Sequence, residues 1–373
     1  MKTLGLYLHI PFCVQKCRYC DFLSAPADEE TMAAYTEALC SEIMQKAEQY
    51  RQYIVNTIFI GGGTPSILPA MLIWKICHVI KENYILDEGI EWSIECNPGT
   101  VTEEKLRTYY ESGINRISFG LQSCNNEELK QLGRIHSYED FLESYSMART
   151  AGFQNINIDL MSALPDQSKE SFQDTLQKVI SLKPEHISAY SLIIEEGTPF
   201  FKQYGNLEMD EELDRDIYRM TEQMLAEAGY QHYEISNYAK EGYASRHNCK
   251  YWKREAYLGL GLGASSMVDD IRWHNETDLK QYVNDQKEQL ERETLTPQDS
   301  MEEFMFLGLR MMRGISAGEF KEQFQKDLVE QYGDILEKHI KEGLIVHDQE
   351  KDSYALTEKG IDVSNYVMSE YLL

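Results

Sequence analysis

Three cysteines lie close together near the start of the chain, in the segment HIPFCVQKCRYCDF that covers residues 9–22. Cys13, Cys17 and Cys20 follow the spacing C-x3-C-x2-C, which lets one short loop place three thiolates around a single compact inorganic centre. On a four-iron, four-sulfur cluster, three thiolate ligands leave one iron open to a ligand from outside the chain. The spacing therefore predicts a 4Fe–4S site held by these three residues, without a fourth neighbouring cysteine.

The open iron suggests a partner for the cluster. S-adenosylmethionine (SAM) can bind that iron through its amino and carboxylate groups, and an electron passed from the reduced cluster into its sulfonium releases a 5'-deoxyadenosyl radical. The alternative is a structural zinc site with His9 or a distant residue as its fourth ligand. Zinc motifs usually show two separated pairs of ligands rather than three thiols in one loop, so the spacing favours the cluster.

Charge and composition limit the classes of function. The chain has 373 residues, a formal net charge of −26 and 42% hydrophobic residues, as a globular protein does. An acidic surface repels phosphate backbones, which argues against nucleic acid as the main ligand. The first residues, MKTLGLYLHIPFC, are too short and too polar a run for a signal peptide, and no apolar stretch is long enough to span a bilayer. We therefore expect a cytoplasmic protein.

The other five cysteines are scattered singly along the chain. Thiols stay reduced in the cytosol, and a lone buried cysteine usually acts as a small hydrophobe. We therefore interpret all five as residues of the hydrophobic core: Cys40, Cys77, Cys96, Cys124 and Cys249.

Short runs rich in aliphatic and β-branched residues predict six strands, and amphipathic patterns between them predict helices. The strands cover residues 4–10, 56–60, 91–96, 115–121, 155–161 and 186–193. Helical periodicity is clearest over residues 32–47, 172–180 and 210–228. Strands that alternate with helices pair in parallel through right-handed crossovers. This order predicts an α/β fold, either a partial barrel or an open doubly wound sheet.

The chemically unusual residues fall at the carboxyl ends of different strands. The cysteines follow the first strand and GGGTP (61–65) follows the second, while Glu95, Gln122 and Asp159 lie at or near the ends of the next three. Barrel active sites are built at that end from many strands, whereas an open sheet uses one crevice. We therefore favour a partial (β/α)6 barrel of the TIM type.

The pattern changes after about residue 236. Residues 236–300 are aromatic and glycine-rich without a clean period, residues 302–311 and 319–328 look helical, and residues 343–360 read as two short strands around a polar turn. Helices followed by a β-hairpin predict an α+β, winged-helix-like module, which in an acidic chain we assign to packing or partner contacts. We expect a barrel over 1–235, a barrel-closing linker over 236–300 and a C-terminal module over 301–373.

The segment LYLHIPFCVQKCRYCDF resembles the cluster loop of the radical SAM enzymes. Within them, GGGTP, SIECNPGT, RISFGLQS and NINIDLMSALPDQ resemble, in the same order, the family of the oxygen-independent coproporphyrinogen III oxidases and their relatives, the heme chaperones of the HemW type. The likeness covers nearly the whole chain. It implies a radical SAM barrel with a 4Fe–4S cluster and SAM as cofactors.

The resemblance also implies a set of SAM contacts. Its motif residues correspond here to Tyr7, Tyr19, Gly62, Gly63, Thr64, Glu95, Gln122, Arg134 and Asp159. In physical terms the two carboxylates suit ribose hydroxyls or an ammonium, and the arginine suits a carboxylate. The alternatives are a tight turn for GGGTP, a core position for Tyr7, and ordinary strand-end polar groups bonded to loop backbone for the others.

The segment RHNCKYW (246–252) carries a second signal. Its structural interpretation is a loop whose Tyr251 and Trp252 pack under the barrel, with His247 satisfied by hydrogen bonds. Its functional interpretation is an apolar pocket with an imidazole able to bind heme iron, and the pattern H-N-x-x-Y-W resembles one characteristic of the HemW type. GLGLGASS (259–266) lacks the G-x-G-x-x-G spacing of a dinucleotide site, so we interpret it as a loop that closes the barrel mouth and could line the cofactor pocket.

Two classes of function remain, a radical oxidase that decarboxylates coproporphyrinogen III and a chaperone that carries heme. The oxidase resemblance implies a further cysteine two positions after Cys20, where this chain has Phe22, and an N-terminal arm, whereas here the first strand begins almost at Met1. With the H-N-x-x-Y-W pattern, both features favour the chaperone. A radical methyltransferase or cyclase is a third possibility, because the cofactor apparatus is shared across such enzymes.

The chaperone interpretation implies partners. We expect heme or another porphyrin, heme-accepting proteins that include membrane-associated respiratory ones, and an electron donor such as flavodoxin or ferredoxin. His247 is the candidate heme ligand.

Overall fold

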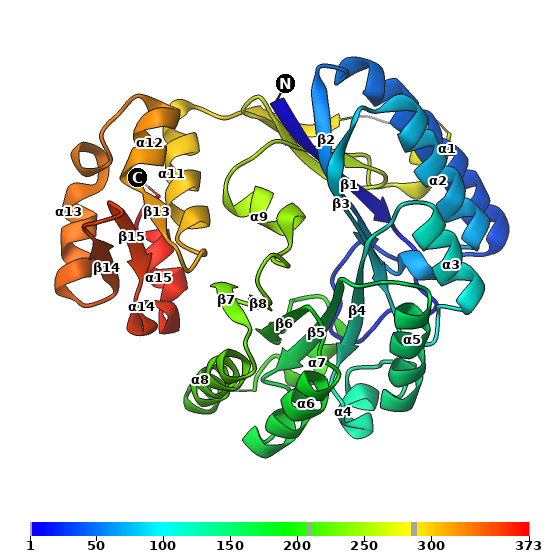
Figure 1. The fold of residues 1–373 in the computed structure, drawn as a ribbon, viewed down its shortest axis with the longest axis horizontal. Coiled ribbons are helices and arrows are strands. Elements are labelled where there is room, and N and C mark those ends of the chain that lie inside the picture. The colour runs from blue at the N-terminus through cyan, green and yellow to red at the C-terminus, as the bar shows by residue number, and fades with distance from the viewer. Residues whose placement is uncertain (1, 208–209, 285–288, 373) are drawn as a thin grey trace.

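The computed structural model describes residues 2–207, 210–284 and 289–372. Four short stretches lie outside the described part: residues 1, 208–209, 285–288 and 373. Each falls within one of the three predicted regions. Figure 1 shows a strongly curved sheet with helices on its outer side and a separate helical module beside its open end.

All six predicted strands are present and pair in parallel. They are β1 (Lys2–Ile10), β2 (Tyr53–Gly62), β3 (Leu86–Cys96), β4 (Arg116–Gln122), β5 (Ile156–Ser162) and β6 (His186–Ser191). They lie side by side in chain order, which gives an open, partial barrel as expected. Most residues of β1, β2 and β4 are buried, whichever face of the sheet they point to. This is typical of a sheet that is covered by helices outside and filled by side chains inside.

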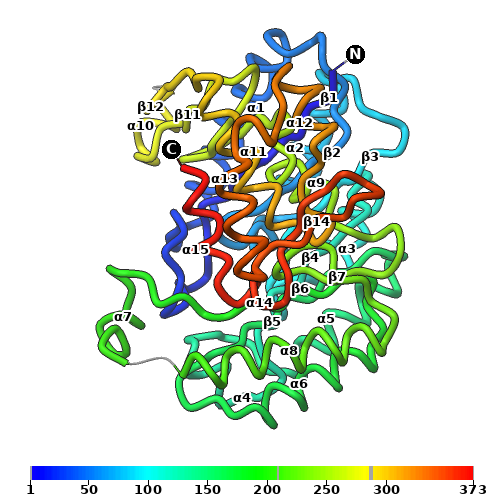
Figure 2. Tube along the Cα trace, turned by 90° about the vertical axis from the view of Figure 1, so that its left-hand side faces the viewer, coloured from blue at the N-terminus to red at the C-terminus, as the bar shows by residue number. Residues whose placement is uncertain are grey.

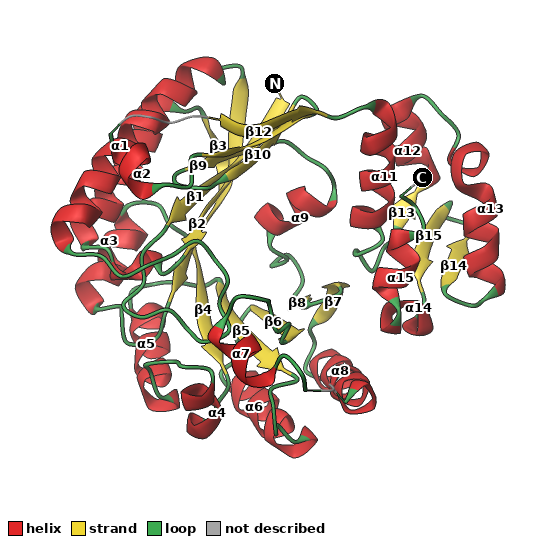
Figure 3. Cartoon of the chain, turned by 180° about the vertical axis from the view of Figure 1, so that it is seen from behind, coloured by secondary structure: helices red, strands yellow, loops and turns green. Residues whose placement is uncertain are grey.

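Helices connect the strands, and most of them lie on the outer side of the sheet, as Figure 3 shows from behind. They are α1 (Glu29–Gln49), η1 (Pro65–Ile67), α2 (Ala70–Asn83), α3 (Glu103–Glu111), α4 (Asn126–Gln131), α5 (Tyr138–Thr150), α6 (Lys169–Ser181), α7 (Pro199–Tyr204) and α8 (Glu211–Glu227). Polar side chains start them: Asp28 accepts from the Thr31 N–H, and Ser137 forms a capping box with Asp140. Helices α6 and α8 run side by side (Figure 2).

Residues 236–300, expected to be a barrel-closing linker without a clean sequence period, contain several short strands and helices. They are β8 (Asn237–Ala239), α9 (Arg246–Trp252), β9 (Tyr257–Leu260), β10 (Ser265–Val268), β11 (Ile271–Asn275), α10 (Leu279–Val283) and β12 (Gln289–Thr294), and β7 (Gln231–Glu234) precedes them. In the described residues the sheet thus reaches twelve strands, with β9 parallel to β1 and antiparallel strands at both ends. Strands of three to six residues are too short to show a clear alternation in the sequence.

The prediction for GLGLGASS is corrected in one respect. Residues 259–266 form the end of β9, a turn and the start of β10, and none of them lines the pocket described below. The turn instead supports the cluster loop from beneath, because a Cβ added at Gly261 would come within 2.6 Å of the His9 carbonyl oxygen. The buried Glu42 fixes this turn by accepting from the Gly261 N–H at 2.9 Å.

Helix α9 lies on the inner side of the curved sheet, between β2 and the C-terminal module (Figures 1 and 3). Its first two N–H groups, of Arg246 and His247, donate to the two carboxylate oxygens of Glu91 on β3 at 3.0 and 2.9 Å. A carboxylate at this helix end satisfies amides that have no partner within the helix.

The C-terminal module has its own hydrophobic core, apart from the core of the barrel. It consists of α11 (Pro297–Gly308), β13 (Ile315–Ser316), α12 (Ala317–Phe324), α13 (Leu328–Lys341), β14 (Ile345–Asp348), β15 (Ser353–Leu356), α14 (Glu358–Asp362) and α15 (Ser364–Ser369). The three short strands form an antiparallel sheet in the order β13–β15–β14, so the predicted hairpin and its flanking helices are confirmed. None of the helices within the described ranges is both long and apolar enough to cross a membrane.

Candidate functional site

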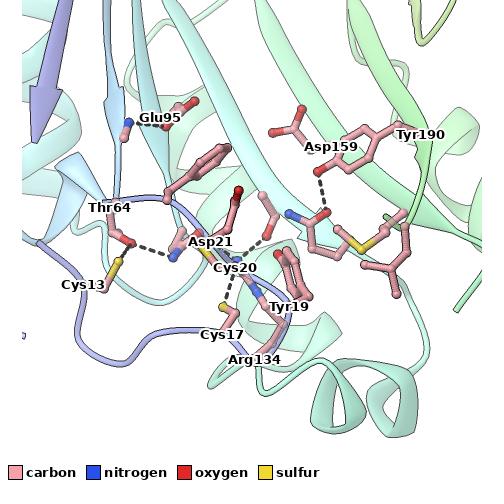
Figure 4. A pocket seen from close by; sticks show the side chains of 18 of the residues that line it. Cys13, Cys17, Tyr19, Cys20, Asp21, Thr64, Glu95, Arg134, Asp159 and Tyr190 are labelled. Carbon is pink, nitrogen blue, oxygen red and sulfur yellow. Dashed lines mark hydrogen bonds between the residues drawn. The ribbon is translucent and has the colours of Figure 1, made fainter. Parts of the chain in front are cut away.

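A cavity of about 340 Å³ opens at the carboxyl ends of the parallel strands (Figure 4). Eleven of the thirteen residues that the sequence singled out line it: Cys13, Cys17, Tyr19, Cys20, Gly62, Gly63, Thr64, Glu95, Gln122, Arg134 and Asp159. They come from β2, β3, β4 and β5 and from the loops after β1, β2 and α4. Parallel strands end at one edge of the sheet, and the strand order brings these distant segments together.

The loop that carries the cysteines is held at several points. The Cys13 N–H donates to the Ala25 carbonyl at 3.1 Å, and the Arg18 N–H donates to the Leu132 carbonyl at 3.0 Å. His9 closes its base, since one ring nitrogen bonds the Leu23 carbonyl at 2.8 Å and the other bonds the Tyr7 hydroxyl at 3.0 Å. Both nitrogens of His9 are therefore engaged, which removes it as the fourth ligand of a zinc site.

Each of two thiols receives a hydrogen bond from a neighbouring loop. The Thr64 hydroxyl donates to Cys13 Sγ at 3.5 Å, and Arg134 Nη1 donates to Cys17 Sγ at 3.5 Å. Such donors stabilise a thiolate and set the potential of a cluster bound through it. Burial raises the pKa of Cys20, so ligation to a metal would be needed to hold that thiol as a thiolate. No group of three or more His, Cys, Asp or Glu side chains in the described ranges is close enough to hold a single metal ion.

The GGGTP segment approaches the cluster loop so closely that only glycine fits. The Gly63 N–H donates to the Ile10 carbonyl at 2.9 Å, and a Cβ at Gly63 would lie 2.6 Å from the Phe12 carbonyl oxygen and 3.0 Å from Cys13 Sγ. Gly62 has a φ of 113°, which side chains rarely allow. Close packing therefore explains the glycines at these positions, and their lack of side chains also leaves the backbone open to a ligand.

Two carboxyl groups face the cavity from β3 and β5. Glu95 Oε2 accepts from the Gly62 N–H at 3.0 Å, and Asp159 accepts from the Ser118 hydroxyl at 3.0 Å and from Asn157 Nδ2 at 2.8 Å. Burial, with the negative charge of Asp159 second, raises the pKa of Glu95 to about 8. Burial also raises the pKa of Asp159. Both groups are acceptors suited to hydroxyl or ammonium donors of a ligand that fills the cavity.

Arg134 links the strand ends to the cluster loop. Its Nη2 donates to the Gly120 carbonyl at 2.5 Å and to Asn97 Oδ1 at 2.7 Å, and Asn97 Nδ2 donates to the Thr64 hydroxyl at 2.9 Å. Gln122 ends β4 with a φ of 73°, a conformation that is uncommon outside glycine and often marks a functional site. The Tyr190 hydroxyl holds the Gln122 side chain by donating to its Oε1 at 3.2 Å.

The structure does not bring Tyr7 or His247 into the cavity. The Tyr7 ring stacks on Phe59, and its hydroxyl bonds His9. His247 is only 1% exposed, and its two ring nitrogens bond the hydroxyls of Thr57 and Tyr251, each at 2.9 Å. Burial lowers the pKa of His247 to about 3, so its ring is neutral. The hydrogen bonds of His247 are those that the structural interpretation of the motif expects, although the motif forms helix α9 rather than a loop.

Sequence reasoning missed several residues of the cavity. Asn97 belongs to the quoted SIECNPGT segment, and Tyr190 lies at the carboxyl end of β6, where the strand-end rule applied to the other strands would have found it. Phe22 and Ile193 line the mouth and are 62% and 72% exposed. Exposed apolar residues in loops have no periodic signal in the sequence.

Comparisons with known proteins agree with this geometry. A family model for the radical SAM superfamily matches residues 7–179, and a model for the HemN C-terminal domain matches residues 295–363. The heme chaperone HemW of Lactococcus lactis is 35% identical over all of this chain and 98% of its own length. HemW of Bacillus subtilis is 36% identical over 98% of both chains, and HemW of Escherichia coli is 41% identical over 72% of this chain and 71% of its own.

The solved structures add one close relative of the fold. Coproporphyrinogen III oxidase (HemN) from Escherichia coli, a radical SAM enzyme, superposes with a TM-score of 0.86 at 25% identity, over 99% of this chain and 90% of that one. Its sequence identity is lower than that of the three chaperones.

Proposed function

Because the chain belongs to the radical SAM superfamily and, within it, to the family of the heme chaperone HemW, we propose that it binds heme and delivers it to recipient proteins. The observation that carries the proposal is the likeness to chaperones along the full length of both chains. The site adds a second argument. The position two residues after Cys20, where the oxidase resemblance implies a further cysteine, is Phe22, an exposed apolar side chain at the cavity mouth.

Membership of the superfamily implies a 4Fe–4S cluster and SAM. The donor set fits both: three thiols line one cavity together with backbone, carboxylate and guanidinium groups. In the proposed assignment Cys13, Cys17 and Cys20 hold the cluster, and Gly62, Gly63, Thr64, Glu95, Gln122, Arg134 and Asp159 contact SAM. When bound, the pair supplies one-electron chemistry at the SAM sulfonium.

The chain's own residues would position these groups rather than react. Thr64 and Arg134 donate hydrogen bonds to the sulfurs of Cys13 and Cys17 and so orient these two side chains. Glu95 and Asp159 offer acceptors to the ribose or the ammonium of SAM, and Gly63 lets the backbone approach. Tyr19 packs with the small apolar cluster of Leu132, Met161 and Leu192 at the edge of the cavity and would keep that side dry. Tyr7 acts in this proposal by holding His9.

The partners remain part of the proposal. Heme is the cargo, the recipients are heme-accepting proteins that include respiratory ones at the membrane, and an electron donor such as flavodoxin or ferredoxin would reduce the cluster. The exposed apolar side chains Phe22 and Ile193 at the cavity mouth offer such partners a contact close to the cluster loop.

The test is an anaerobic titration of the reconstituted protein with hemin. We expect saturable binding near one heme per chain, followed in the Soret band, and retention of heme through gel filtration. Failure to retain heme would overturn the proposal.

The cluster assignment has its own test. Cys17→Ala should abolish the visible absorbance of the reconstituted cluster, because two thiolates cannot hold it against solvent. Cys40→Ala is the matched control, since Cys40 is a buried core thiol on α1, and it should bind iron and sulfide normally. Full iron and sulfide content in Cys17→Ala would contradict the assignment.

The oxidase is the second candidate, because the fold superposes on HemN along nearly its full length. Coproporphyrinogen III, SAM and a reductant added to the reconstituted protein should yield no decarboxylated porphyrinogen. Turnover of the propionates would favour the oxidase over the chaperone.

A further inference from the structure

A second cavity, of about 350 Å³, lies where the end of α9 meets α11 and α15. Its apolar wall consists of Trp252, Phe306, Leu307 and Met368, with Arg310 beside them, and we call it the α9–α15 groove. Within the described residues it shares no lining residue with the cluster cavity. Figure 1 shows α9 between the sheet and α11, so the groove lies on the side of α9 that faces the C-terminal module.

Two buried donors beside the groove lack partners among the described residues. The Arg310 guanidinium lies 4.4 Å from the centre of the Trp252 ring, and it pairs through Nη2 with Glu234 at 3.2 Å. Its Nε–H has no acceptor, and neither has the indole N–H of Trp252. They are two of fifteen buried side-chain polar atoms without a partner in the described part of the chain, and these two lie on residues that line one groove.

The composition of the groove defines the chemistry of that ligand. An aromatic ring, aliphatic side chains and a thioether suit a flat apolar body, while an arginine with unused donors suits a carboxylate. In a chain with a net charge of −26, a cation next to an apolar wall favours an anionic ligand over a cationic one. Met368 is 9% exposed and offers a soft sulfur, which is an axial ligand of heme iron in some cytochromes. Heme combines a flat apolar ring, two carboxylates and an iron.

On these observations, and resting on the proposed carrier function, we propose that the α9–α15 groove is the heme site. The porphyrin lies against Trp252, a propionate reaches Arg310, and the Met368 thioether faces the iron.

In this proposal the two ends of the H-N-x-x-Y-W motif have different functions: His247 anchors the helix and Trp252 contacts the ligand. His247 and Trp252 belong to the same short helix, with His247 anchored in the barrel by Thr57 and Tyr251 and Trp252 reaching the groove. His247 is then a positioning residue that holds Trp252 in place. Direct ligation of iron by His247 would require both of its hydrogen bonds to break and a 1% exposed side chain to open.

The first experiment blocks the groove in the intact, reconstituted protein. Leu307→Glu places a carboxylate on its apolar wall and should weaken hemin binding by about tenfold or more, because the new charge would replace apolar surface under the porphyrin and compete with the propionate for Arg310. Val329→Glu is the matched control, since Val329 is a 53% exposed apolar residue on α13 in the same module, and its hemin affinity should match that of the wild type. Cluster absorbance and thermal midpoint verify that both variants are folded.

Two further measurements test the ligand contacts. Met368→Leu keeps the volume but removes the sulfur, so the Soret maximum should shift while cluster absorbance does not. Hemin dimethyl ester, which has no free carboxylate, should bind the wild type about tenfold more weakly than hemin, because the charged hydrogen bond to Arg310 is lost.

The outcomes separate this site from the proposed function. Failure of the wild type to retain hemin overturns both. Retention by the wild type together with unchanged affinity in Leu307→Glu and an unchanged Soret maximum in Met368→Leu overturns only the groove. Displacement of hemin by an unrelated apolar peptide, together with an unchanged hemin affinity in Leu307→Glu, would likewise overturn the groove as the heme site.

Discussion

Close contacts between two loops set the geometry of the cluster cavity. Gly63 touches the backbone of Phe12 and the sulfur of Cys13, so the segment after β2 fixes where the first thiol points. Thr64 and Arg134 then donate to the sulfurs of Cys13 and Cys17. The thiols are therefore held by the neighbouring loops as much as by their own.

Gly63→Ala should lower the iron content of the reconstituted protein several-fold, because the new methyl group would lie 2.6 Å from the Phe12 carbonyl oxygen and push the cluster loop away. Iron and sulfide analysis measures the effect. Gly318→Ala is the control, since a Cβ there meets only ordinary van der Waals contact at 3.5 Å. Normal iron content in Gly63→Ala would show that the loop can move without loss of the cluster.

Glu95 should make the stability of the SAM-free protein depend on pH. Its pKa is about 8 in the folded protein against a usual value of 4.5, so folding binds a proton between these values. Its contribution is fully present below about pH 4.5 and is lost as pH rises toward 8, at up to about 1.4 kcal/mol per pH unit. Urea unfolding across pH 5–8 should show this slope in the wild type and not in Glu95→Gln. Parallel curves for the two proteins would contradict the raised pKa.

The residue types in the cavity were predictable because strand ends converge in parallel sheets, so sequence position alone places Cys13, Glu95 and Asp159 near one another. The direction in which each side chain points was not predictable from the sequence. Tyr7 lies on a strand, as predicted, and His247 lies on helix α9 where a loop was expected, but the rings of both are packed in the interior and bond other residues. That choice depends on partners far away in the sequence.

Helix α9 lies between the barrel sheet and the α9–α15 groove. Its start is capped by Glu91 and its histidine packs on Phe59, while its last residue borders the α9–α15 groove. A seven-residue helix is too short to be stable by itself, so these tertiary contacts hold it.

His247→Ala should lower the free energy of unfolding by about 2–4 kcal/mol, because a buried ring and two hydrogen bonds are lost. The Soret maximum of any heme that the variant binds should equal that of the wild type. Urea unfolding and the heme spectrum measure the two effects. A shifted Soret band with unchanged stability would identify His247 as an iron ligand instead.

The parallel strands and their helices followed from hydrophobic periodicity, whereas the short strands β7–β12 did not. Each of the latter is stabilised mainly by the sheet edge on which it adds, and a run such as GLGL has no alternation to reveal it. The hairpin β14–β15 was predictable because a polar turn separates two apolar runs.

The C-terminal module is joined to the barrel by a buried ion-pair network. Glu303 on α11 pairs with Arg254 and Arg272 at 2.7 Å each, and Arg254 also pairs with Asp270 at 2.8 Å. Arg254 and Glu303 are 3% and 7% exposed. The network thus ties α11 to the segment that follows α9 and to β11.

Glu303→Ala should lower the free energy of unfolding by about 3 kcal/mol, because Arg254 would keep a buried charge with the half-exposed Asp270 as its remaining acidic partner. Glu319→Ala, which removes an exposed pair with Arg313, should cost about 1 kcal/mol or less. Urea unfolding compares the two variants. Equal stability of both would mean that the buried network does not hold the module.

The open sheet also ends in two border strands, and both are protected against self-association. One border is β12, whose exposed Glu291, Arg292 and Glu293 would place charges opposite like charges in a copy added there. The other is β7, whose outer edge is covered by residues 310–312: the Met312 N–H donates to the Tyr233 carbonyl and the Ile235 N–H to the Arg310 carbonyl, both at 3.1 Å. The open barrel is thus protected from growing into fibrils by charge at one border and by a covering segment at the other.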